Sequence, residues 1–319
     1  MNPVERIAIF RPGALGDTLL AFPALAALRA RYPTAQILVV GNFDALSLAQ
    51  SSGLADTIAD FAAPEWATLF TETSEDLVPA ALAGIDTAIL WLRDPDSIVA
   101  SNLRRLGVPR IIQAPGQPDV TARTHAATHL LATLQPLDIA FASLPLPPLR
   151  LPAAAEGWAA DWWQAQGLMD QHVIAIHPGS GGQHKCWPAG RYAALADILT
   201  ANGAAILLVA GPADTTILAA LRAAQQTPPA AIAHNLPLPL LSALLRRCAA
   251  FVGNDSGVTH LSALLGLPTV AIFGPTDPAV WAPLGPHVYI VAPPAIGPIA
   301  QISLESVLAA PPLRRSDRM

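Results

Sequence analysis

The chain has 319 residues; 52% are hydrophobic, 13% are charged, and the formal net charge is −5. This composition excludes intrinsic disorder, and the negative charge argues against a nucleic-acid-binding surface. Apolar runs are too short for a spanning helix, the first residues do not form a signal peptide, and two cysteines make no disulfide framework. We therefore expect a cytoplasmic protein of two domains, since one domain usually has about 150 residues.

The first half predicts strands that alternate with helices. Apolar residues at helical spacing (Leu19, Phe22, Leu25 and Leu28) predict a helix that ends before Pro33. This alternation is typical of a parallel sheet with helices on both faces. The predicted strands cover residues 7–10, 36–40, 86–91 and 110–113, and the helix covers 18–31.

A proline-rich segment, residues 135–152, interrupts the alternation and predicts a linker between domains 1–150 and 151–319. Two doubly wound α/β domains are expected to face a central cleft at the carboxyl ends of their strands, and the last helix could pack back on the first domain. In the second half we expect strands at 172–177, 204–210, 249–252 and 269–273, and helices at 153–166, 191–201, 214–224, 240–247 and 257–265.

The turn after the first strand, residues 11–17, reads RPGALGD. Its two glycines allow a sharp turn and a close approach to a ligand, and the helix that follows offers free N–H groups. The GxxG spacing disfavours a dinucleotide site, which needs GxGxxG. Asp17 is either a helix cap or a carboxylate that accepts a proton from a hydroxyl.

A second loop contains the single lysine of the chain, Lys185, beside 17 arginines elsewhere. The loop, residues 177–188, reads HPGSGGQHKCWP, and its glycines and Ser180 can wrap around phosphate oxygens. A compact ammonium group would supply the counter-charge. The alternative is a flexible surface loop in which one lysine arose by chance.

Two more polar turns follow strands of the second half. Residues 253–260 read GNDSGVTH, and backbone N–H groups at 256–258 favour an anion at the start of the next helix. His260 lies one turn further on, and Asp255 is alternatively a plain helix cap. The turn at 273–278, FGPTDP, closes the next strand at the same edge of the sheet.

Residues 94–96, Asp-Pro-Asp, form a pair of carboxylates that suits a divalent ion with a diphosphate. We instead expect Asp96 or Ser97 to cap the helix that follows, and no metal. The polar turns together are typical of a transferase that moves a group from a nucleotide diphosphate to a hydroxyl. A nucleotide-sugar-binding protein of the same fold without turnover stays open as the alternative; an epimerase and a dehydrogenase are disfavoured.

In their order these motifs resemble glycosyltransferase family 9, the lipopolysaccharide heptosyltransferase family. The resemblance runs nearly from end to end. The matching pieces are a GD pair at 16–17 before a helix that ends in Tyr32-Pro33, the PG…KxWP loop at 178–188, the GPAD turn at 211–214, DSGxxH at 255–260, and GPTDP at 274–278 followed by Trp281.

The resemblance implies a GT-B fold of two Rossmann-like domains, an N-terminal one for the acceptor and a C-terminal one for the nucleotide sugar. It implies an inverting reaction without metal or cofactor, with Asp17 as general base and Lys185 at the donor phosphates. The implied donor-binding residues are Ser180, Lys185, Asp214, Asp255, Ser256, Gly257 and His260; the acceptor-binding residues are Arg11, Gly16, Arg93 and Arg123.

The implied partners are a nucleotide-diphosphate sugar, most often ADP-heptose in this family, and a lipid-linked or glycan acceptor. Transient contact with the inner-membrane surface is compatible with such an acceptor, and no nucleic acid is expected. The chain departs from the family pattern at Cys186, where a basic residue is frequent, and after Asp214, where no second carboxylate follows.

Overall fold

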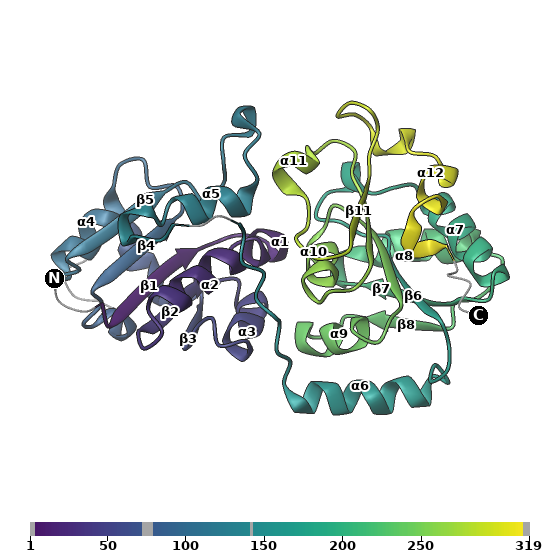
Figure 1. The fold of residues 1–319 in the computed structure, drawn as a ribbon, viewed down its shortest axis with the longest axis horizontal. Helices are drawn as coiled ribbons and strands as arrows, with labels where there is room; N and C mark the ends of the chain where they lie inside the picture. Colours follow the sequence, from purple (N-terminus) through teal and green to yellow (C-terminus); the bar gives the residue numbers. More distant parts are fainter. Residues whose placement is uncertain (1–3, 72–78, 141–142, 315–319) are drawn as a thin grey trace. The chain divides into compact units, whose positions relative to one another are not determined.

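The computed structural model describes residues 4–71, 79–140 and 143–314 (Figure 1). The chain divides into two compact units, unit 1 up to Arg150 and unit 2 from Leu151 onward. Each unit contains its own parallel sheet.

Unit 1 is built on a five-stranded sheet in the order β3-β2-β1-β4-β5. All pairings are parallel, and Phe10 of the central strand lies opposite Val40 on one side and Leu90 on the other. The strands are β1 (Arg6–Arg11), β2 (Gln36–Gly41), β3 (Thr57–Asp60), β4 (Thr87–Trp91) and β5 (Arg110–Ala114).

Helices cover both faces of this sheet. Ala8 and Phe10 lie in a core with α4, while Ile7 and Ile9 alternate with them, are also fully buried, and so point to the opposite face. The helices are α1 (Leu15–Leu19), α2 (Phe22–Arg31), α3 (Phe43–Ser51), α4 (Ile98–Arg105) and α5 (Ala126–Ala132).

The single helix predicted at 18–31 is wrong: the structure has the two helices α1 and α2, which break at Leu20 and Ala21. Pro23 lies in the first turn of α2. Proline has no N–H to donate and clashes with the carbonyl four residues earlier, so it favours the start of a new helix over the interior of a long one.

Unit 2 has a six-stranded parallel sheet in the order β11-β10-β9-β6-β7-β8. Its central strands are buried on both faces, which is typical of a doubly wound sheet. The strands are β6 (Val173–His177), β7 (Ala205–Ala210), β8 (Ala231–His234), β9 (Ala250–Asn254), β10 (Thr269–Ile272) and β11 (Val288–Val291).

The helices of unit 2 complete the layers, and α6 packs along α9 (Figure 1). The last helix, α12, contacts α7, and Val307, Ala310 and Leu313 are buried in the core of unit 2. The expectation that the last helix also packs on the first domain stays a prediction. The helices are α6 (Ala153–Ala165), α7 (Ala189–Ala201), α8 (Thr215–Ala224), α9 (Leu238–Leu245), α10 (Gly257–Leu264), α11 (Pro278–Trp281) and α12 (Leu304–Leu308).

Both units are doubly wound α/β folds, which confirms the predicted fold class. Of the helices in the described residues, none combines the length and the apolar character that crossing a bilayer requires.

Candidate functional site

In each sheet there is one pair of neighbouring strands from which the chain goes on to opposite edges of the sheet. This is the topological switch point, at which open α/β sheets bind ligands. In unit 1 it lies between β1 and β4, and in unit 2 between β6 and β9. His177 ends β6 and pairs with Gly253, next to Asn254 at the end of β9. The predicted donor loops therefore leave the sheet side by side.

The side chain of Asn254, fully buried, holds the loop that follows β6. Its Nδ2 donates to the carbonyl oxygens of Pro178 at 2.7 Å and Gly179 at 3.1 Å. Its Oδ1 accepts from the Trp187 N–H and from the Tyr192 hydroxyl, each at 2.9 Å. One amide thus fixes both ends of the glycine loop, residues 178–187.

Within this loop Lys185 forms an ion pair with Asp255, at 2.8 Å from Nζ to Oδ2. The same Oδ2 accepts a 2.8 Å hydrogen bond from Thr276, and His260 Nε2 lies 3.9 Å from Oδ1. Burial alone would raise the pKa of Asp255, but the polar contacts with His260, Lys185 and Thr276 and the charge of Lys185 lower it to about 2. Asp255 is therefore ionised at neutral pH and holds the lysine in place.

The start of α10 can receive an anion. Ser256 is its N-cap, and its Oγ accepts from the Thr259 N–H, which leaves the N–H groups of Gly257 and Val258 without an intrahelical acceptor. The ammonium of Lys185 has three protons and gives one to Asp255, so two remain for a ligand. Positive charge, helix dipole and free N–H groups at one switch point suit a diphosphate.

Ser180 and Asp214 have structural partners. The Ser180 hydroxyl donates to the carbonyl oxygen of Asp255 at 2.7 Å. Asp214 is 7% exposed; its Oδ2 accepts from Gly211 N–H at 2.7 Å and lies 3.0 Å from His177 Nε2. Its predicted contact with the donor stays a prediction.

His177 is buried beside Asp214, and burial lowers the pKa of His177 to about 4 although the charge of Asp214 opposes the shift. The imidazole is therefore neutral at pH 7. Gly179 lies directly over the Asp214 carboxylate, because a Cβ built on Gly179 would come within 1.9 Å of Oδ1. Only glycine leaves room for this carboxylate.

In unit 1 the structure brings Arg11, Gly16 and Asp17 together at the switch point. Arg11 is 4% exposed, and its guanidinium donates to the carbonyl oxygens of Pro12 at 2.8 Å and Asp17 at 3.2 Å. Burial lowers the pKa of Arg11, and Asp17, 3.6 Å away, opposes that shift. Asp17 Oδ2 accepts from the Ala14 N–H at 3.3 Å. Asp17 is thus not the N-cap of α1, which is Ala14; it lies at the third position of the helix and accepts from the N–H of the N-cap residue. Its role as a base stays a prediction.

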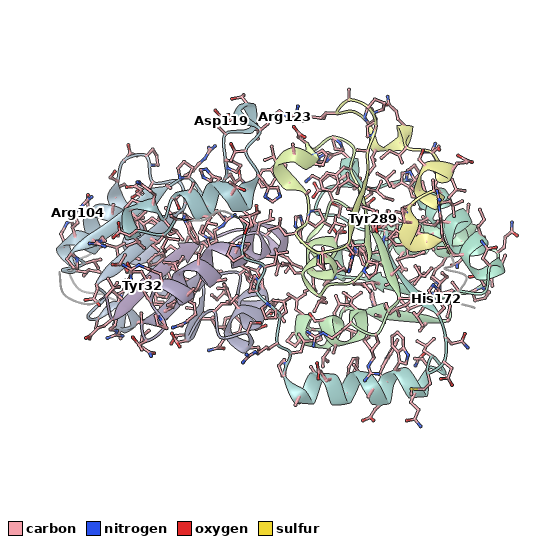
Figure 2. All side chains as sticks on the ribbon, in the orientation of Figure 1. Tyr32, Arg104, Asp119, Arg123, His172 and Tyr289 are labelled. Carbon is pink, nitrogen blue, oxygen red and sulfur yellow. The ribbon has the colours of Figure 1, made fainter. Side chains whose placement is uncertain are left out.

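The other predicted acceptor residues lie elsewhere on unit 1. Arg93 is exposed just beyond β4. Arg123 lies on a loop that projects from unit 1 ahead of α5 (Figure 2). Their contact with an acceptor stays a prediction.

The expected cap at Asp96 or Ser97 is wrong. Asp94 accepts from the N–H groups of Val99 and Ala100, at 3.2 and 3.0 Å, and so caps α4 itself. Ser97 has a left-handed backbone with φ of 54° and makes no side-chain cap. Among the residues that the structure describes, three or more His, Cys, Asp or Glu side chains nowhere gather in a way that could hold a metal ion.

Sequence reasoning missed three residues of the unit 2 site: Asn254, Thr276 and His177. Thr276 lies in a turn that the sequence did single out, so its position after β10 was the available signal. His177 and Asn254 also lie in motifs that the sequence did single out, residues 177–188 and 253–260, but neither was given a role, although a polar residue at the end of a buried strand is unusual.

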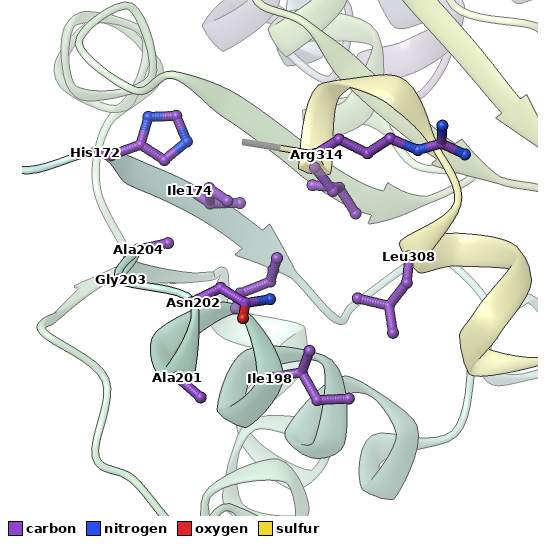
Figure 3. A pocket seen from close by; sticks show the side chains of 11 residues that line it. His172, Ile174, Ile198, Ala201, Asn202, Gly203, Ala204, Leu308 and Arg314 are labelled. Carbon is purple, nitrogen blue, oxygen red and sulfur yellow. The ribbon is translucent and has the colours of Figure 1, made fainter. Parts of the chain in front are cut away.

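A cavity of about 680 Å³ lies at the other end of the unit 2 sheet (Figure 3). His172 and Ala204, which precede β6 and β7, line it together with Ile198 and Leu308. The amino ends of the strands lie at the opposite edge of the sheet from the carboxyl ends where the predicted donor loops emerge, so this cavity is separate from the switch point.

A model of glycosyltransferase family 9 (heptosyltransferase) matches residues 113–307, more than half of the chain. Lipopolysaccharide heptosyltransferase 3 of Escherichia coli is 32% identical over 132 residues, which cover 39% of this chain and 39% of that protein. The chain therefore spans less than half the length of this relative in sequence.

Two solved structures share the fold. A glycosyl transferase family 9 protein from Veillonella parvula has a TM-score of 0.81 and 21% identity, with 97% of both chains covered. The E. coli ADP-heptose lps heptosyltransferase II has a TM-score of 0.74 and 22% identity, with 95% of this chain and 96% of that chain covered. The shared fold is the predicted GT-B class.

Replacing Asn254 should destabilise unit 2. Asn254→Asp keeps the size of the side chain but removes the donor and turns a carboxylate oxygen toward two buried carbonyl oxygens. We expect a loss of about 3 kcal/mol in unfolding free energy, measured by urea denaturation. The exposed Asn202→Asp is the matched control and should change the value by less than about 0.5 kcal/mol. Equal stability of both variants would contradict the role of Asn254.

Stability should depend on the pH through His177. Its pKa is about 4 when folded and 6.5 when exposed, so the unfolded chain binds the extra proton between these values. Stability is then complete above pH 6.5 and is lost as the pH falls toward 4, by about 2 kcal/mol at pH 5. Urea midpoints at pH 7 and pH 5 measure this loss, which should shrink in His177→Gln. A loss of the same size in that variant would assign it to another group.

Proposed function

Because the chain belongs to glycosyltransferase family 9, we propose that it transfers a sugar from a nucleoside-diphosphate donor to a hydroxyl group of a lipopolysaccharide or a related cell-surface glycan. The observation that carries the proposal lies at the unit 2 switch point, where Lys185 forms an ion pair with Asp255, the residue before the N-cap of α10. Heptose is the expected sugar, since the relatives are heptosyltransferases.

In this proposal unit 2 stabilises the leaving group. As the bond between the sugar and the diphosphate breaks, negative charge grows on the phosphate oxygens. Lys185 and the N–H groups of Gly257 and Val258 are fixed donors for that charge, and their fixed geometry avoids a reorganisation cost during the reaction. Asp255 would contribute by orienting the lysine, because a second anion repels a phosphate. His260 and Ser256 complete the donor surface.

Unit 1 would activate the acceptor. Asp17 accepts the proton of the acceptor hydroxyl as that oxygen attacks the anomeric carbon from the face opposite the diphosphate, which inverts the configuration. A carboxylate is a weak base, so the proton transfer must come late, when the sugar already carries positive charge. Arg11 and Gly16 shape the loop, and Arg93 and Arg123 are the basic residues for an anionic acceptor. We expect no metal in this reaction, which would take place at the cytoplasmic face of the inner membrane.

A transfer assay tests the whole proposal. Purified protein, ADP-heptose and a heptose-deficient lipopolysaccharide acceptor should give a product whose anomeric configuration, determined by NMR, is opposite to that of the donor. The rate should be unchanged in EDTA. Donor binding without transfer would instead support a nucleotide-sugar-binding protein.

Lys185→Ala should weaken nucleotide binding. A hydrogen bond to a charged group contributes about 1.5–3 kcal/mol, so the Kd for ADP should rise by about tenfold to a hundredfold in calorimetry. Arg222→Ala removes one positive charge from an exposed position near the end of α8 and should leave the Kd unchanged. An unchanged Kd in Lys185→Ala would remove the lysine from the donor site.

Asp17→Asn should reduce turnover by about a hundredfold or more and keep the affinity for the donor. Asparagine can still accept from the Ala14 N–H, so the loop should stay intact. Asp44→Asn, in the first turn of α3 on the same unit, is the control and should have normal turnover. Normal turnover in Asp17→Asn would refute the assignment of the base.

A further inference from the structure

Three buried side chains connect the two sides of the unit 2 switch point. Asp214 Oδ2 lies 3.0 Å from His177 Nε2, and His177 Nδ1 lies 3.4 Å from Ser256 Oγ. Asp214 follows β7, His177 ends β6, and Ser256 caps α10 after β9. All three side chains are at most 9% exposed, so solvent does not separate them from one another.

The positions of the protons on these three side chains follow from their surroundings. Burial keeps the imidazole neutral at pH 7, so one ring nitrogen carries the proton and the other accepts. Asp214 offers only a carboxylate oxygen, so the proton must lie on Nε2. Nδ1 is then an acceptor, and the Ser256 hydroxyl is its neighbouring donor.

The hydroxyl of Ser256 has a second acceptor close by. Thr259 donates its own proton to the Asn254 carbonyl oxygen at 2.5 Å, so Thr259 Oγ1, 3.1 Å from Ser256 Oγ, has no proton to give back. Without His177 the Ser256 hydroxyl would turn to Thr259 alone. His177 Nδ1 at 3.4 Å and Thr259 Oγ1 at 3.1 Å thus compete for the single proton of the Ser256 hydroxyl, while the oxygen lone pairs stay available to the Thr259 N–H.

We propose that His177 is a positioning residue of the donor site, which transmits the fixed geometry of Asp214 to the Ser256 cap and so places the N–H groups that receive the diphosphate. This inference rests on the proposed function, because it names how that site is held rather than another ligand. Asp214 then acts through His177, enclosed by Gly179 and Gly211, instead of touching the nucleotide.

Two substitutions test the two nitrogen atoms of the imidazole separately. His177→Gln keeps a donor near the Nε2 position for Asp214 but removes the acceptor for Ser256. His177→Asn keeps an acceptor near the Nδ1 position. For the nucleoside diphosphate that wild type binds best among ADP, GDP, UDP and CDP, we expect the Kd to rise about tenfold in His177→Gln and less than about threefold in His177→Asn.

A double-mutant cycle tests the coupling. Ser256→Ala should weaken binding about tenfold, and His177→Gln with Ser256→Ala should also weaken it about tenfold rather than a hundredfold, because both remove the same connection. All affinities are measured well below the unfolding temperature of each variant. A general loss of stability would lower that temperature without producing this coupling. His172→Gln, at an exposed position before β6, is the matched control and should keep the wild-type Kd.

Additive effects, or a wild-type Kd in His177→Gln, would overturn this inference and leave the proposed function standing. Wild-type protein that binds none of the four nucleotides would overturn both. A measurement that needs no variant is the 1H–15N correlation spectrum of histidine-labelled protein, in which the His177 proton should lie on Nε2. A proton on Nδ1 would overturn the inference that His177 accepts from Ser256 and positions it.

Discussion

The carboxyl edge of the unit 2 sheet depends on one buried amide, the side chain of Asn254. Its four hydrogen bonds join the end of β9 to residues more than 60 positions earlier in the chain, and they satisfy two carbonyls, one N–H and one hydroxyl that are buried. A parallel sheet alone brings two strand ends together. The amide adds the geometry, because it fixes where the glycine loop leaves the sheet and where Lys185 meets Asp255.

Much of the fold could be predicted from sequence because the central strands are continuous apolar runs. The edge strands β3 and β11 were not predicted. Each has only four residues and none of them is buried, so the sequence there shows no alternation of apolar and polar residues that would indicate a strand. The break between α1 and α2 was missed because apolar spacing continues across it, and only Pro23 marks the new start. The helix α3 was missed although Asn42 provides an ordinary N-cap.

Site residues could be predicted from sequence where their residue type stands out. They could not be predicted where the role of a residue depends on which side chain it contacts. Lys185 is conspicuous as the single lysine, and the polar turns mark the sheet edge. Asp255 and Asp214, however, look alike in sequence. Only the fold shows that one carboxylate faces an ammonium and two further polar groups, whereas the other is closed in under Gly179 against a neutral imidazole. Contacts between side chains that are 30 to 80 residues apart in sequence cannot be predicted from local sequence patterns.

The lysine has a practical consequence. Its side chain is 28% exposed, and the chain contains no other side-chain amine. A reagent selective for primary amines therefore has one internal target, and that target lies in the proposed anion site. The extent of acylation at this position, read by mass spectrometry, would report directly on how fully the site is occupied, without a label having to be engineered into the protein.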